Sequence, residues 1–123
     1  MKFFIVMPKH LVPFYKKEIS EAMVELEKKN YPVCWTHLER AHILAQPYPF
    51  EHTSVHWKML RFGIQIKNLK EVIGQIPRLL FGGVKSFVGK IPIGNTGGAN
   101  VPPLRFMQIP PDLAAIINKT HTN

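Results

Sequence analysis

The chain has a single cysteine, Cys34, among its 123 residues. An internal disulfide is therefore excluded, and the composition fits a reducing compartment. Cys34 could serve as a weak metal ligand, but we expect a buried structural thiol.

Long hydrophobic runs are also missing. No stretch approaches the length of a membrane span. The apolar run at residues 3–7 is too short for a secretory leader, and it ends at Pro8 without a small-residue cleavage site. We therefore predict a cytoplasmic protein whose N-terminal segment packs against the domain.

Basic charge is abundant but not concentrated. Lys and Arg number 16 against 8 Asp and Glu, which gives a net charge of +8. No block of five or six basic residues gathers that charge, so we interpret it as a solvated basic surface. We do not expect nucleic acid to be a partner.

Recognised catalytic patterns are absent as well. The sequence contains no plausible Ser-His-Asp set, no supported Cys-His dyad and no HExxH motif. A non-enzymatic role is expected.

The chain does contain helical periodicity. Apolar residues recur at helical spacing through residues 13–29, 32–46 and 50–67, with short connections between them. A weaker stripe of Leu69, Val72, Ile73 and Ile76 follows. Pro77 should break or kink it, and residues 77–88 are expected to form a further short helix. These patterns predict an all-α fold, an antiparallel bundle of about four or five helices over residues 13–88.

Residues 89–111 are rich in Gly and Pro and are predicted to form an extended arm that wraps over the bundle. Within it, residues 94–98 (GNTGG) could offer N–H groups to an anion, but a tight turn with positive φ is preferred. Residues 112–118 should form a short terminal helix. We expect residues 1–123 to form one domain.

Four of the six histidines lie in residues 35–60, across the predicted turn between the second and third helices. Glu39 and His42 are three residues apart and His52 and His56 are four apart, so each pair shares one face of a helix. Both pairs fall on the apolar stripe, where a polar side chain is costly without a partner.

Three imidazoles and a carboxylate in facing pairs predict a divalent metal site. The expected ligands are Glu39, His42, His52 and His56, and the expected ion is Zn²⁺, or alternatively Fe²⁺, Mn²⁺ or Co²⁺. Glu39 would either bind the ion or orient His42. His37 points elsewhere on its helix and is left out of the site.

Other interpretations of these residues stay open. His42 and His56 could be core histidines satisfied by hydrogen bonds. Glu18 or Glu25 could add a carboxylate to the site, although solvated positions at the edge of the first helix are preferred. The alternative function is a metal-free module that docks a protein partner or a membrane surface through the hydrophobic arm or through residues 77–88. For residues 77–88 we favour a plain bundle helix.

The segments LERAHILAQ, HTSVHWKML, PIGNTGGANV and IPPDL together resemble a family of small bacterial proteins classed as a domain of unknown function. The resemblance covers residues 14–113. The matching positions are Leu38, Glu39, Arg40, Ala41, His42, His56, Met59, Gly94, Asn95, Thr96, Gly97, Asn100 and Val101. The resemblance implies a bacterial protein of one compact domain, and it implies no particular activity.

Overall fold

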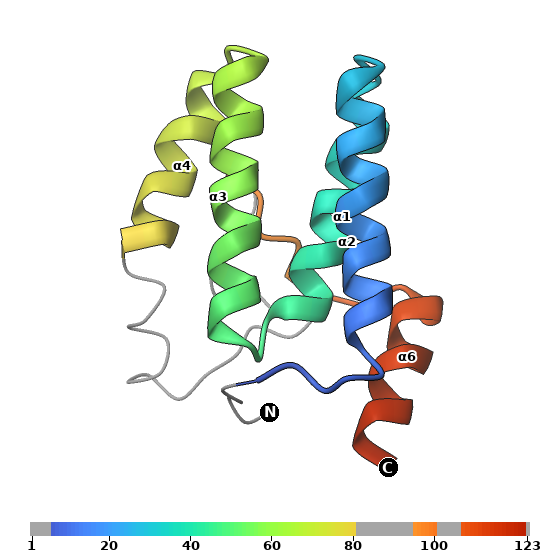
Figure 1. Ribbon diagram of the computed structural model, residues 1–123. Helices are drawn as coiled ribbons and strands as arrows, with labels where there is room; N and C mark the ends of the chain where they lie inside the picture. Colours follow the sequence, from blue (N-terminus) through green and yellow to red (C-terminus); the bar gives the residue numbers. More distant parts are fainter. Residues whose placement is uncertain (1–5, 81–94, 101–106, 123) are drawn as a thin grey trace.

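The computed structural model describes residues 6–80, 95–100 and 107–122 (Figure 1). The described residues form helices and connections without strands, which confirms the all-α prediction. The helices are α1 (Val12–Glu27), α2 (Tyr31–Ala45), α3 (Pro49–Gln65), α4 (Leu69–Leu80) and α6 (Pro111–Thr122).

Prolines begin the first three helices, and tight connections end them. Pro13, Pro32 and Pro49 each lie in a first helical turn, where the missing N–H has no cost. Lys29 and Lys67, with φ of 60° and 58°, take the left-handed conformation just after α1 and α3. Each connection is three residues long, so successive helices run antiparallel.

The second helix is the centre of the molecule. α2 packs against α1, α3 and α6, and α4 packs on the other side of α3. Its inner face buries Leu38, Ala41 and Leu44 completely or nearly so. Cys34 is also fully buried, as predicted, and burial raises the pKa of its thiol to about 11.

Of the two outcomes expected at Pro77, a break or a kink, the break is wrong, because a single helix, α4, continues past it to Leu80. A proline inside a helix removes the hydrogen bond to the carbonyl four residues earlier, which here belongs to Ile73. Both residues lie on the exposed side of α4, where water can reach that carbonyl.

The orientation of α4 also differs from the apolar stripe in its sequence. Leu69, Ile73 and Ile76 face outward, while Glu71 and Gln75 are buried. The polar side of this helix therefore faces the bundle. The predicted helix at 77–88 and the arm at 89–111 lie largely outside the described residues. Residues 95–100 and 107–110 of the arm are non-helical, as predicted, and α6 is longer than the predicted 112–118.

Candidate metal centre

Three histidines of the α2–α3 hairpin meet inside the bundle. His42 lies in the last turn of α2, and His52 and His56 lie one turn apart near the start of α3. The three-residue connection, with Tyr48 extended before Pro49, turns the chain so that these two helix ends face each other. A turn centred at residues 46–49 predicts that His42 faces His52 and that Glu39 faces His56. The structure brings His42 to His52, and it sets His42 rather than Glu39 against His56.

The three Nε2 atoms form a nearly equilateral triangle. They are 2.9 Å apart between His42 and His52, and 3.1 Å apart in both pairs that include His56. The ring centroids are 4.7 Å apart in every pair, so the rings surround a common centre. Their exposed fractions are only 1%, 4% and 1% in chain order, which removes bulk water as a partner.

The other nitrogen of His42 fixes which form of the ring is present. Its Nδ1 lies 2.7 Å from the backbone carbonyl oxygen of Asn95. A carbonyl only accepts hydrogen bonds, so Nδ1 must carry the hydrogen. In the neutral ring, Nε2 then carries a lone pair that points at the centre of the triangle.

The same argument holds for His56, through Gln75. The amide nitrogen of Gln75 donates to Glu71 Oε2 at 2.6 Å and to the carbonyl of Gly97 at 2.8 Å. These two acceptors orient the amide, so its oxygen is the atom 2.6 Å from His56 Nδ1. His56 therefore donates from Nδ1 and also presents a lone pair at Nε2.

Two lone pairs thus face each other at 3.1 Å in a buried site. A single hydrogen on His52 Nε2 would have to be shared between them. Buried polar atoms that repel one another are costly, whereas a cation at the centre attracts all three. The arrangement is thus chemically suited to a cation with nitrogen ligands.

The size of the nitrogen triangle also suits a zinc ion. A point equidistant from three nitrogens at these separations lies about 1.8 Å from each in their plane, and a Zn–N bond is about 2.0–2.1 Å. An ion slightly out of the plane would satisfy all three distances with little movement of the rings. Three protein ligands leave a fourth coordination position for water or another ligand.

The turn at residues 95–100 forms one wall of the site, and Figure 1 shows this segment crossing between α2 and α3. Gly97 has a φ of +84°, which confirms the predicted tight turn. A Cβ added there would lie 2.5 Å from His42 Cδ2, so only glycine fits against the ring. The side chain of Asn95 accepts a hydrogen bond from Gly97 N at 2.9 Å, which closes the turn.

Glu39, the fourth predicted ligand, does not join the three histidines. Their ligand atoms form a group within 4.8 Å of one another that does not include its carboxylate. Burial raises the pKa of Glu39, and the nearby polar groups of Thr96 and Trp35 act in the opposite direction. The carboxyl therefore lies in a partly apolar environment beside the turn.

A second cluster joins α1, α2 and α6. His37 Nδ1 lies 2.7 Å from Glu18 Oε2 and 3.4 Å from Glu21, and Arg40 Nε donates to Glu18 at 2.8 Å. Arg40 also pairs with Asp112, and this hydrogen bond lowers the pKa of that carboxyl. Glu18 is buried in these contacts, so the expected solvated position was wrong. Its charge is balanced by Arg40, which makes this group a poorer metal site.

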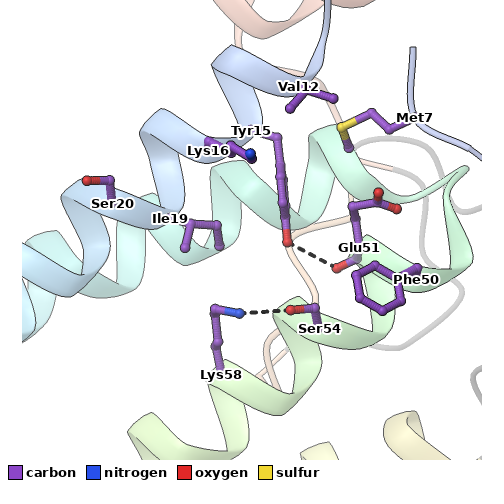
Figure 2. A pocket seen from close by; sticks show the side chains of 10 residues that line it. All are labelled: Met7, Val12, Tyr15, Lys16, Ile19, Ser20, Phe50, Glu51, Ser54 and Lys58. Atoms are coloured by element: carbon purple, nitrogen blue, oxygen red, sulfur yellow. Dashed lines mark hydrogen bonds between the residues drawn. The ribbon is translucent and has the colours of Figure 1, made fainter. Parts of the chain in front are cut away.

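A cavity of about 330 Å³ separates α1 from α3 (Figure 2). Tyr15 bridges it by donating to the carbonyl of Glu51 at 3.4 Å, and Lys58 donates to Ser54 at 2.8 Å. Burial lowers the pKa of Lys58 and raises that of Tyr15. None of the three histidines lines this cavity, so it is separate from the candidate metal centre.

Sequence reasoning did not find the residues that orient the histidines. Gln75 is fully buried on α4, and Glu71 accepts hydrogen bonds from Gln75 and from the N–H of Ala99. One signal was present, since Glu71 and Gln75 are polar and one turn apart on the same face of an amphipathic helix. Asn95 and Gly97 lie in the GNTGG segment, which was interpreted as a tight turn or, less favoured, as an anion-binding loop, and not as a partner of the histidines.

Residues 9–117 match the family described as Protein of unknown function (DUF3703), and the chain belongs to this family. The resemblance inferred from the sequence to a family of unknown function is thereby confirmed. No curated protein and no solved structure matches the chain. No helix in the described part of the chain is long and apolar enough to cross a membrane.

Proposed function

We propose that the protein binds a divalent metal ion, Zn²⁺ in the first instance, through the Nε2 atoms of His42, His52 and His56. The observation that carries the proposal is the buried triangle of nitrogens, two of which present lone pairs fixed by Asn95 and Gln75. Pairing of a ligand imidazole with a carbonyl or carboxylate is the usual outer-shell arrangement of histidine metal sites.

The ligand type favours some ions over others. Imidazole suits Zn²⁺, Co²⁺ and Fe²⁺, whereas Mn²⁺ prefers carboxylate oxygens. With Glu39 outside the ligand group, Mn²⁺ should bind most weakly of the four ions named from the sequence. Water would complete the coordination, and Glu39 would act on the site from outside the ligand set.

The experiment is isothermal titration of untagged, chelator-treated protein with Zn²⁺, Co²⁺ and Mn²⁺. We expect one ion per chain, with affinity in the order Zn²⁺, Co²⁺, Mn²⁺. His42→Ala and His56→Ala should weaken binding by more than the roughly 10–100-fold that outer-shell changes cost. Affinity should fall at pH 6, because an imidazole with a pKa of about 6.5 must lose its proton to bind.

The matched control is His37→Ala, which removes an imidazole of α2 outside the triangle. It should leave the affinity unchanged. Equal binding by the parent and by the His42→Ala and His56→Ala variants would reject the site. Absence of binding by the parent would favour the metal-free interaction module.

A further inference from the structure

The outer face of the α3–α4 hairpin carries an apolar strip that we call the α3–α4 seam. It consists of five side chains that remain 44–69% exposed. They are Trp57, Ile64, Leu69, Ile73 and Ile76. Monomeric proteins rarely leave so many large apolar side chains together in water, so such a strip indicates contact with an apolar partner.

Helix geometry places these side chains side by side. α3 and α4 pack closely at Gly63, where an added Cβ would lie 3.2 Å from Val72 Cγ2. At about 100° per residue, Ile64 and Trp57 follow Gly63 around the outside of α3. Ile73 and Ile76 follow Val72 around the outside of α4 in the same way. The two rows therefore flank one contact line and form a continuous surface.

The outward position of this strip follows from the buried hydrogen bonds on the other side of α4. α4 has the strongest apolar–polar separation of the described helices, yet its polar side chains Glu71 and Gln75 face the bundle. Gln75 is held there by His56 and the carbonyl of Gly97. Once this side is buried, the apolar side of α4 must face outward.

The charges around the seam are of one sign. Residues 49–80 contain five basic side chains and only two acidic ones. Arg61, Lys67 and Lys70 are exposed, whereas Glu71 is buried and Glu51 is half-buried. By the same geometry, Arg61 and Lys70 lie at the outer edges of the two apolar rows. An apolar strip with basic edges is typical of helices that lie in an anionic membrane interface.

We propose that the α3–α4 seam binds an anionic lipid bilayer, with its apolar side chains among the acyl chains and its basic edges at the head groups. A bilayer supplies both the apolar and the negative partner that this face requires. A second copy of the chain is a poorer occupant, because a symmetric contact would bring the basic edges of both copies together. This proposal is independent of metal binding.

The test is cosedimentation of the full chain with vesicles of phosphatidylcholine alone, or with one third phosphatidylserine. The parent should bind the mixed vesicles, bind less at high salt, and bind phosphatidylcholine weakly. The Trp57 emission should shift to the blue, and this shift should be missing in Trp57→Phe. Arg61→Glu with Lys70→Glu should reduce partitioning at least about tenfold.

Ile64→Ser with Ile73→Ser should also abolish binding, since both side chains are exposed and the fold does not depend on them. Val33→Ser on α2 is the matched control, since Val33 is 39% exposed and outside the seam, and it should bind like the parent. Circular dichroism confirms that each variant is folded. Failure of the parent to bind, unchanged binding by the seam variants, or a dimer in solution that the seam variants dissociate would overturn the proposal.

Discussion

At the scale of single residues, His42 and His56 each have one ring nitrogen committed to a carbonyl oxygen. When the rings are neutral, their other nitrogens carry lone pairs that point at one another and repel. An ordinary core would relieve that repulsion by rotating a ring or an amide. Gln75 cannot rotate without losing its bonds to Glu71 and Gly97, so the lone pairs stay where they are.

Gln75 should therefore control metal affinity without contacting the ion. Gln75→Leu removes the acceptor for His56 Nδ1 and leaves a buried donor unsatisfied, at a cost of about 1–3 kcal/mol. We expect zinc affinity to fall about 10–100-fold. The same change at the exposed Gln65 on α3 is the control. If both variants bind zinc like the parent in titration calorimetry, Gln75 does not orient the ligand.

Glu39 should behave as a carboxyl whose burial opposes ionisation. Its pKa in the folded protein is raised above the ordinary 4.5, so the folded state holds the proton more tightly than the unfolded state. Stability of the metal-free protein should then fall as pH rises from about 4.5 through the raised pKa, and change no further above it.

Glu39→Gln removes this ionisation. Its melting temperature minus that of the parent should be larger at pH 7 than at pH 4, as measured by circular dichroism without metal. Zinc affinity of the variant should fall by less than that of His42→Ala. A loss as large as that of His42→Ala would make Glu39 a ligand, as the sequence first indicated.

At the scale of elements, the α2–α3 hairpin could be predicted because its signals are local. Three prolines at helix starts, helical spacing and the short connection before Pro49 determine that His42, His52 and His56 face each other. The partners of these histidines could not be predicted in that way. Asn95 is 53 residues from His42 and Gln75 is 19 from His56, and no periodic pattern connects such positions.

The orientation of helix α4 could not be predicted from its sequence either. Its apolar stripe was correctly recognised as helical, but hydrophobicity alone would place that stripe in the core. The hydrogen bonds of Gln75 and Glu71 outweigh the preference of the apolar stripe for the core. Buried polar groups whose hydrogen bonds are satisfied fix the orientation of a helix. Glu39 was included among the ligands for a related reason. Helical spacing shows on which face of a helix a side chain lies. It does not show whether the carboxylate of Glu39 reaches the histidine nitrogens.

Gly97 links the turn to the histidine triangle. Gly97→Ala adds a Cβ at 2.5 Å from His42 Cδ2, at a φ of +84° that alanine adopts with difficulty. We expect a loss of about 1–3 kcal/mol in unfolding free energy, as for other overpacked sites. Zinc affinity should also fall, because the ring must move.

A double-mutant cycle separates the two effects. In a His42→Ala background the ring is absent, so Gly97→Ala should cost only the backbone strain. Urea unfolding of the four proteins measures the difference. If the cost of Gly97→Ala is the same in both backgrounds, the contact between the turn and the ring contributes nothing.

At the scale of the whole molecule, three separate parts of the chain converge on one centre. α2 and α3 supply the imidazoles, α4 supplies Gln75, and residues 95–100 supply the carbonyls and the glycine that fit around them. The ion–pair cluster of Glu18, His37, Arg40 and Asp112 ties α1 and α6 to the same central helix. The fold is thus arranged around α2, with the histidine triangle at its C-terminal end.

The most direct test of this account is a crystal structure of the protein loaded with zinc, with diffraction data measured on both sides of the zinc absorption edge. The account predicts one anomalous peak, about 2.0–2.1 Å from the Nε2 atoms of His42, His52 and His56. An anomalous peak at Glu18, Glu21 and His37 instead, or none within bonding distance of the three histidines, would contradict it.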